Sequence, residues 1–361
     1  MSGDLAAKLA RRTLELVRTP SVYGGEKALC DALCAWAAER FSPGQLTRVG
    51  NSLAAGRPSG SRPAIALVGH LDTVPPHEGD PEPAIDGDRV VGLGASDMKS
   101  GLAVALALAD DLDLDALPFD LVVVAYDKEE GPHEDSGLAP LLEACPHLAD
   151  VDLAIVGEPT DNVIQVGCVG SIHATLTFRG QSAHSARPWH GENAVHKAGH
   201  LLADLEARRP VEVEVGGHVF REVMTITSAT GGRYRNVVPD RFELNLNYRF
   251  APGRSLGDAM ADIKDFVGDA AEVEFTDLSP SGEVPSGKVY DHVVTRAGLP
   301  VAPKQAWTDV ARLAEAKIPA LNFGPGLTAQ AHQPGEYCEI PMLVEAYRTL
   351  RRVLETPMPV R

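Results

Sequence analysis

The sequence predicts an α/β protein in which a mostly parallel sheet, with helices on both faces, is interrupted by an inserted α+β domain. A length of 361 residues favours two domains over one. In roughly the first half of the chain, short segments apolar on both faces alternate with helical segments, as in sheets covered on both sides. Further on, apolar and polar residues alternate with a period of two, which is typical of strands with one solvated face.

The α/β part is predicted element by element from its apolar runs. Two helices are expected over residues 4–18 and 24–40, followed by a buried strand at 64–69. The segment "SDMKSGLAVALALADDL" predicts a helix capped by Ser96 or Asp97. Further short buried strands are expected in "FDLVVVAYD", in "DLAIVG" and, near the C-terminal end, in "KIPALNFGPG".

The inserted part contains four alternating segments and two helical ones. "SIHATLTFRG", "EVMTITSATGG", "RFELNLNYRF" and "AEVEFTDL" predict strands, whereas "ENAVHKAGHLLADLEARR" and "SLGDAMADIKDFVG" predict helices. Their order, β-α-β-β-α-β, predicts a ferredoxin-like two-layer domain with an antiparallel sheet. We place this domain at residues 172–283, between the two α/β segments 1–171 and 284–361.

Charge and composition exclude some classes of partner. The formal net charge is −17, which disfavours nucleic acid and anionic membrane surfaces because both would be repelled. The start of the chain is amphipathic and carries acidic residues, unlike a signal peptide. No uninterrupted apolar run reaches the length of about 18 residues that a membrane span needs.

The cysteines are scattered and odd in number: Cys30, Cys34, Cys145, Cys168 and Cys338. This usage favours a reducing compartment, and we therefore expect a cytoplasmic protein. Cys30 and Cys34 are four residues apart on a predicted helix, a spacing that suits two buried thiols at least as well as a pair of metal ligands.

Polar side chains follow several of the predicted strands or open the helix after one. In open α/β sheets, ligands bind beyond the carboxyl ends of the strands, so these side chains are candidates to meet in one crevice. Two imidazoles and several carboxylates form a plausible ligand set for Zn²⁺ or a similar divalent ion. The residues are His70, Asp72, Asp97, Glu129, Glu130, Glu158 and His332.

The segments that carry these residues resemble the five signature motifs of the M20 family of dinuclear metallopeptidases and deacylases. They read "GHLDTVP", "GLGASDMKSG", "DKEEG", "GEPT" and "AHQPGE", in the family's order and spacing, and the likeness covers essentially the whole chain. The resemblance implies a catalytic α/β domain, an inserted lid or dimerisation domain, and two bound divalent ions. Zinc is the expected metal, and cobalt is expected to substitute for it.

The resemblance also implies a role for each residue of the set. One ion is held by His70 and Glu158, and the other by Glu130 and His332; Asp97 bridges the two. Successive side chains of an extended segment point in opposite directions, so Glu129 and Glu130 should not both be ligands. With Glu130 as the ligand that the resemblance implies, Glu129 would face the reacting water as general base. Asp72 is expected to hold the ring of His70 by accepting its second N–H.

The inserted domain supplies a second set of candidates. "RGQSAHSARP" resembles the lid segment whose histidine reaches into the partner's active site in family dimers, so we expect a homodimer in which His184 stabilises the oxyanion. Asn236 and Arg249 match polar lid positions that contact substrate, although a turn and a sheet ion pair explain them equally well. Thr308 and Gly324 are further candidates for substrate contact.

Two segments narrow the choice of substrate within the family. "PKQAWTDVARL" and "AHSARPWHGENAVHKA" are similar to the branch that removes succinate from N-succinyl-LL-2,6-diaminopimelate in lysine biosynthesis. Cations for such a substrate are available at Arg187, Arg233, Arg235, Arg249 and Lys304. The stretch "VGCVGS" departs from many desuccinylases, which carry basic residues there.

Three other functions stay open at this point. They are a deacetylase of the N-acetylornithine type, another aminoacylase or carboxypeptidase of the family, and a non-catalytic protein that binds a small molecule. All ligand positions and Glu129 are filled in this sequence, which disfavours the non-catalytic alternative.

Overall fold

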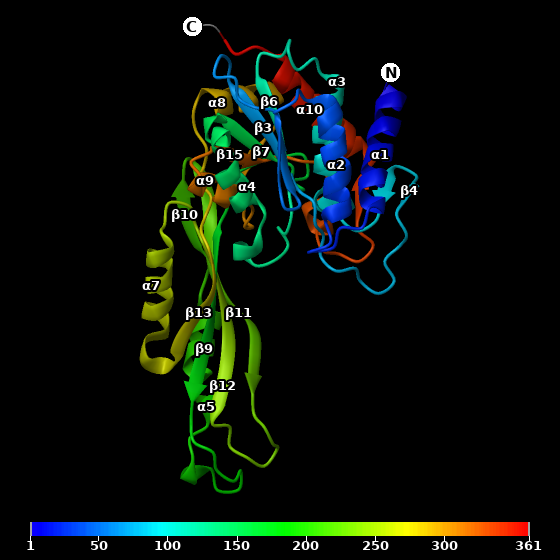
Figure 1. The fold of residues 1–361 in the computed structure, drawn as a ribbon. Coiled ribbons are helices and arrows are strands. Elements are labelled where there is room, and N and C mark those ends of the chain that lie inside the picture. Colours follow the sequence, from blue (N-terminus) through cyan, green and yellow to red (C-terminus); the bar gives the residue numbers. More distant parts are fainter. Residues whose placement is uncertain (1, 360–361) are drawn as a thin grey trace. The chain divides into compact units, whose positions relative to one another are not determined.

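The computed structural model describes residues 2–359, which form two compact units (Figure 1). Of the described chain, the first unit contains residues 2–167, 283–304 and 312–359. The second unit contains residues 168–282 and 305–311. The prediction of an α/β part interrupted by an α+β part is confirmed, because the two units carry these two kinds of sheet.

The first unit is built on a sheet that has eight strands within the described residues. β3 and β6 are buried along their whole length, as their apolar runs predict, and β3 pairs in parallel with β6 and β7. In order across the sheet, the strands are β1 (Leu46–Val49), β2 (Ser52–Ala55), β6 (Asp120–Tyr126), β3 (Ala64–His70), β7 (Leu153–Val156), β15 (Ala320–Asn322), β8 (Ile164–Val166) and β14 (Val301–Pro303).

The two ends of this sheet depart from the parallel arrangement. β1 and β2 form an antiparallel hairpin that pairs with β6, and β8 runs antiparallel to β15. β1 and β2 were not predicted, because these segments are only four residues long and lack a continuous apolar run. The sheet is therefore mostly but not entirely parallel.

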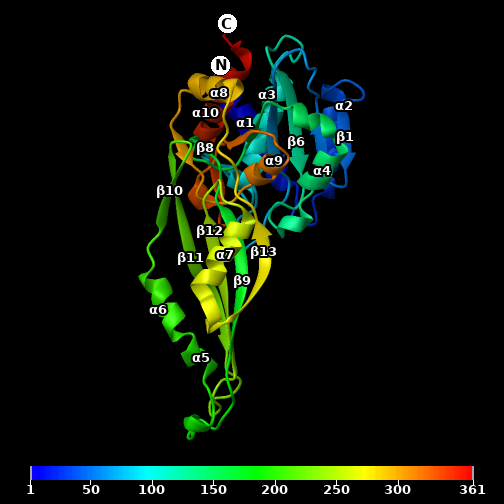
Figure 2. The same cartoon turned by 90° about the vertical axis from the view of Figure 1, so that its left-hand side faces the viewer.

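Helices cover both faces of the sheet (Figures 1 and 2). On one face, α1, α2, α3 and α10 share an apolar core with the strands, and α4 packs on β1 and β2 without joining that core. The helices of this unit are α1 (Ser2–Arg18), α2 (Lys27–Arg40), α3 (Ser100–Asp111), α4 (Leu138–Ala144), α8 (Lys288–Ala297) and α10 (Ile340–Glu355). A small sheet joins β4 (Ala84–Asp86), β5 (Arg89–Val91) and β16 (Tyr337–Glu339), and α9 (Val310–Glu315) carries residues of both units.

The predicted cap of the third helix is wrong. Ala95–Lys99 forms an irregular helical turn in which Asp97 has the non-helical angles φ −114° and ψ 97°. The α-helix begins only at Ser100, after an N-cap residue, Lys99, that makes no side-chain cap. Asp97 is held out of the helix because its backbone N–H bonds a distant carboxylate, that of Glu336.

The second unit is an antiparallel sheet with helices packed on one face (Figure 2). Within the described residues the sheet has the order β10 (Val211–Val215), β11 (His218–Gly231), β12 (Arg241–Phe250), β9 (Gly170–Arg179) and β13 (Glu272–Ser279). The predicted alternation of apolar and polar residues is present in β12, where Leu244, Leu246 and Tyr248 enter the core. The helices are α5 (Ala194–Lys197), α6 (Gly199–Ala207) and α7 (Leu256–Val267).

This unit differs from the predicted β-α-β-β-α-β order by one strand. β10 forms an edge hairpin with β11 and was not predicted, although "VEVEV" alternates. The first predicted helix is divided into α5 and α6, whereas the second begins at the predicted place with a capping box between Ser255 and Asp258. Over residues 2–359, no helix combines the length and the apolar character that crossing a bilayer demands.

Candidate metal site

The site lies where β3 and β7 end, side by side in the sheet. His70 is the last residue of β3, and Glu158 comes two residues after β7. The strands are parallel and Val68 is in register with Val156, so the two side chains leave the same edge on the same face. Both are buried, with 1% and 6% of their surfaces exposed.

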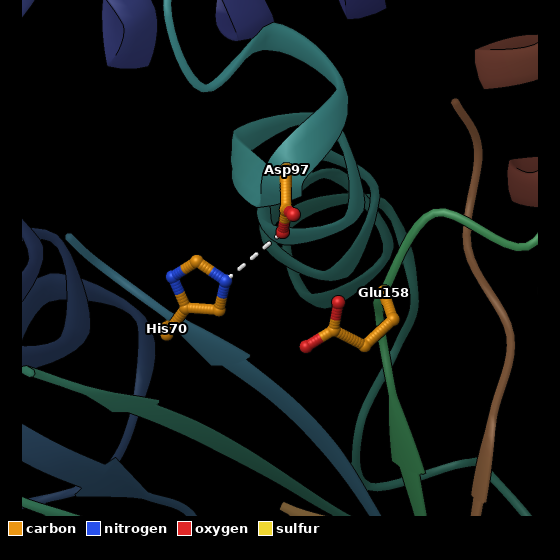
Figure 3. Close-up of side chains that lie close together, drawn as sticks. All are labelled: His70, Asp97 and Glu158. Carbon is orange, nitrogen blue, oxygen red and sulfur yellow. Dashed lines mark hydrogen bonds and ion pairs between the residues drawn. The ribbon is translucent and has the colours of Figure 1, made fainter. Parts of the chain in front are cut away.

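The irregular turn before α3 brings a third polar side chain to this edge. Asp97 Oδ1 lies 3.2 Å from His70 Nε2. Figure 3 shows Asp97 and His70 joined by this contact, with the Glu158 carboxylate facing the same space. Ligand atoms of these three residues lie within 4.8 Å of one another.

Asp97 is positioned by Glu336, whose carboxylate collects three backbone N–H groups of the turn. Glu336 Oε1 accepts hydrogen bonds from Ser96 N at 2.7 Å and Asp97 N at 2.8 Å. Glu336 Oε2 accepts one from Gly94 N at 2.8 Å. Burial raises the pKa of Glu336 to about 7. Glu336 is the last residue of the motif "AHQPGE", and no role was predicted for it.

Asp72 is buried, and its carboxylate holds the loop after β6 through hydrogen bonds. Its Oδ1 and Oδ2 accept hydrogen bonds from the backbone N–H groups of Glu129 and Glu130, at 3.0 and 2.9 Å. His70 Nδ1 lies 3.1 Å from the Asp72 carbonyl oxygen and 3.5 Å from Oδ1. Asp72 therefore supports both neighbouring parts of the site, not only the ring of His70 that the resemblance implied.

Glu130 and His332 complete the set from two loops. His332 Nε2 lies 3.0 Å from Glu130 Oε2 and 3.6 Å from Asp97 Oδ2. Ligand atoms of Asp97, Glu130 and His332 lie within 4.8 Å of one another, as do those of His70, Glu129 and Glu130. All seven predicted residues of the first unit thus meet at one edge of the sheet.

Negative charge dominates this space. Burial, and then the neighbouring Asp97, raises the pKa of Glu158 to about 7. Burial would also raise the pKa of Asp97, but His70 and His332 outweigh it and lower that pKa. The hydrogen bond with Glu130 raises the pKa of His332 to about 9. Crowded carboxylates that share imidazoles are a donor set that fits divalent cations, which would offset the repulsion.

The predicted residues of the inserted domain lie in the second unit. His184 is exposed, forms an isolated bridge with Val237, and accepts a hydrogen bond from the backbone N–H of Ala186 at 3.0 Å through Nδ1. Asn236 is adjacent, because its carbonyl oxygen accepts from the backbone N–H of Ser185. Their roles toward substrate stay predictions.

Two more predicted substrate residues have defined surroundings in the second unit. Arg249 lies on β12 and donates from Nε to Asn247 Oδ1 at 3.0 Å. Thr308 is 3% exposed, and its Oγ1 is buried with no hydrogen-bond partner among the described residues. A buried hydroxyl without a partner is a group that a ligand or water usually satisfies.

Gly324, in the first unit, packs against the backbone of Gly157 and Glu158. A Cβ there would approach Gly157 O to 2.3 Å, so only glycine fits this crossing. Its backbone N–H and C=O both bond Thr160. These contacts explain the glycine by packing, and its proposed contact with substrate stays a prediction.

Comparison with known proteins identifies the family. The profile of peptidase family M20/M25/M40 matches residues 66–356. The chain therefore belongs to this family of hydrolases.

Two relatives that match along nearly the whole chain carry the name succinyl-diaminopimelate desuccinylase. The succinyl-diaminopimelate desuccinylase of Corynebacterium glutamicum is 34% identical over 351 residues, covering 95% of this chain and 95% of that protein. A Mycobacterium tuberculosis H37Rv protein provisionally given the same name is 37% identical over 357 residues, covering 97% of this chain and 99% of that protein.

Solved structures share the fold at lower identity. Aminopeptidase PepT of Bacillus cereus has a TM-score of 0.79 at 19% identity and covers 97% of this chain and 98% of its own. The YxeP protein of Bacillus subtilis, described as a dinuclear metal-binding peptidase of the M20 family, has a TM-score of 0.71 at 15% identity, with 98% of each chain covered.

The hydrogen bonds of Glu336 lead to a prediction about stability. Glu336→Gln places an amide N–H₂ against at least one of the three N–H donors. We therefore expect the free energy of unfolding to fall by about 1–3 kcal/mol. Urea unfolding of the variant and of wild type in the same buffer measures the change. Glu339→Gln, whose ion pair with Arg89 is long at 3.8 Å, is the control and should change stability by less than about 0.5 kcal/mol. Equal effects of the two variants would contradict the positioning role.

Proposed function

We propose that this protein hydrolyses the succinyl amide of N-succinyl-LL-2,6-diaminopimelate. The products are succinate and LL-2,6-diaminopimelate, an intermediate of lysine biosynthesis. The single observation that carries the proposal is the end-to-end match to relatives named for this activity, at 34% and 37% identity. It is supported by the side chains gathered at the sheet edge, where each ligand position of the family is filled by a donor of the appropriate type.

We propose that the site holds two divalent ions. His70 and Glu158 would bind one ion and Glu130 and His332 the other, with Asp97 shared between them. The donor atoms fit, because these imidazole and carboxylate groups already lie within 4.8 Å of their neighbours in overlapping sets. When bound, such ions lower the pKa of a water molecule and polarise an amide carbonyl. The mixture of imidazole and carboxylate ligands favours zinc, which cobalt could replace.

Glu129 would act as general base. Its backbone is fixed by Asp72, while its neighbour Glu130 bonds His332, so the two adjacent glutamates have different tasks. In the proposed reaction the Glu129 carboxylate takes one proton from the attacking water. The C–N bond then breaks, and Glu129 returns that proton to the departing amine, so that the carboxylate is regenerated.

We assign residues 1–171 and 284–361 to a catalytic domain and residues 172–283 to a lid and dimerisation domain. These limits lie close to those of the compact units, although 305–311 group with the second unit. In the proposed homodimer, His184 of one chain would stabilise the oxyanion formed in its partner's site, and Asn236, Arg249 and Thr308 would contact substrate. The cytoplasm remains the expected compartment, because all five cysteines are free thiols.

Substrate preference tests the function directly. We expect kcat/KM for N-succinyl-LL-2,6-diaminopimelate to exceed that for N-acetylornithine, because the acetyl group lacks the free carboxylate of the succinyl group. Steady-state assays with both substrates and the same metal-loaded enzyme measure the ratio. A higher kcat/KM for the acetyl substrate would assign the protein to the deacetylases instead.

The proposed base gives a second prediction. Glu129→Gln keeps the shape of the side chain but cannot accept the proton, so kcat should fall by about 10²–10⁴. Metal analysis should still find two ions per chain, because Glu129 is not a proposed ligand. The control Glu134→Gln, in the same loop region, should keep wild-type kcat. Unchanged kcat in Glu129→Gln, or the loss of an ion, would refute the assignment.

The role of His184 across the dimer is tested by mixing two inactive variants. In a heterodimer of Glu129→Gln and His184→Ala, one site would combine an intact Glu129 with the partner's intact His184. Random exchange should restore about one quarter of wild-type activity, since half the dimers are mixed and each has one complete site. If mixed dimers form but activity does not return, His184 does not act on the partner's site.

A further inference from the structure

A tight turn at residues 77–80, in the first unit, lies against the loop that carries His332. The segment "PPHEGD" forms this turn, in which the backbone N–H of Asp80 donates to the carbonyl oxygen of His77 at 3.2 Å. Gly79 has a φ of 87°, the left-handed value that the third residue of a type II turn needs. The local sequence therefore fixes a turn with a polar side chain at each end.

Both of these side chains hydrogen-bond the loop of His332, which we define as residues 327–336. His77 Nε2 lies 3.1 Å from the carbonyl oxygen of His332, and it is the donor because a carbonyl oxygen only accepts. Asp80 Oδ1 accepts from the backbone N–H of Gly335 at 3.0 Å, and Asp80 Oδ2 accepts from the backbone N–H of His77 at 2.7 Å. The hydrogen bond from Gly335 lowers the pKa of Asp80, so this carboxylate is ionised at neutral pH.

The conformation of His332 shows why bonds to its backbone matter. Its φ is 59°, in the left-handed region that a residue with a Cβ seldom occupies unless its surroundings hold it there. The side chain of His332 is 52% exposed, whereas that of His70 is 1% exposed. Packing therefore fixes the ring of His70 but contributes much less to the position of His332.

The rest of this loop has few other attachments. At its two ends, Thr328 bonds Asp161, and Glu336 holds the turn before α3. Between these ends, apart from ring contacts inside the metal site, the hydrogen bonds that link the loop to other segments of the described chain are those with His77 and Asp80. The 77–80 turn is therefore the main restraint on the backbone next to the ligand.

The turn is itself well placed to act as a support. It follows Asp72, whose carboxylate holds the backbone of Glu130, and it is joined to the segment after α1 by the bridge between Val22 and Thr73. One continuous segment after β3 thus supports the loop of Glu130 and the loop of His332. These are the two proposed ligands of the second ion that the first ion does not share.

We propose that His77 and Asp80 are positioning residues that hold His332 in its metal-binding conformation and thereby set the affinity of the second ion. The inference rests on the proposed function, in which Glu130 and His332 bind that ion. An exposed ligand that becomes ordered only when the ion binds loses part of the binding free energy to this ordering, and a ligand that is already held does not. Groups that orient the ligands of a metal usually affect its affinity in this way.

Metal binding by the apo-protein tests the inference. Metal is removed with a chelator, and Zn²⁺ is then titrated in a buffer that sets its free concentration, while the ions bound per chain are counted. We expect His77→Ala and Asp80→Ala each to weaken one ion by about 10–100-fold and to leave the other unchanged. The control Glu78→Gln should match wild type, because Glu78 is exposed in the same turn and bonds no residue between 2 and 359.

A conservative variant separates the hydrogen bond from the ring that makes it. In His77→Gln the amide N–H₂ can still donate to the carbonyl oxygen of His332, so most of the wild-type affinity for the second ion should return. A His77→Gln variant that binds the second ion as weakly as His77→Ala would contradict the role of this hydrogen bond.

A double variant shows which ion is affected. His332→Ala removes a ligand of the second ion, so this variant should keep one ion, at His70 and Glu158. Adding Asp80→Ala should leave the affinity of the remaining ion unchanged, because the ligand that Asp80 positions is already absent. If Asp80→Ala weakens the remaining ion, it acts on the fold as a whole, and the inference is wrong.

The outcomes separate this inference from the proposed function. A wild type that binds fewer than two ions removes the dinuclear site, whatever the variants do. A wild type that binds two ions and hydrolyses the succinyl substrate, combined with His77→Ala and Asp80→Ala variants that bind both ions as tightly, overturns the role of the turn alone.

Discussion

The crowding of buried carboxylates at the end of the parallel strands is the constraint on which the first unit depends. Asp97, Glu130 and Glu158 share a small space with the rings of two histidines, and ionised carboxylates repel strongly where water is scarce. Burial, and then the negative charge of Asp97, raises the pKa of Glu158 to about 7. The surrounding apolar core supplies the folding free energy that holds these carboxylates together. Bound divalent cations would offset the repulsion, because the carboxylates would coordinate them.

The parts of the site that follow from local sequence patterns could be predicted, and the parts held by distant side chains could not. His70 and Glu158 come at the ends of apolar runs, so the pattern that predicts the strands also predicts their position. Asp97 was placed at a helix cap, but its backbone is pulled into another conformation by Glu336, which is 239 residues away. No local propensity contains that interaction, and only the motif "AHQPGE" could have drawn attention to it.

The same division applies to the fold of the second unit. β9, β12 and β13 were predicted because alternation over eight to ten residues is a strong signal. The short edge strand β10 was missed because its five residues form a hairpin whose outer face is solvated, so few of its side chains enter the core. On the polar face of the same sheet, His173 contacts the side chains of Asn245 and Asn247.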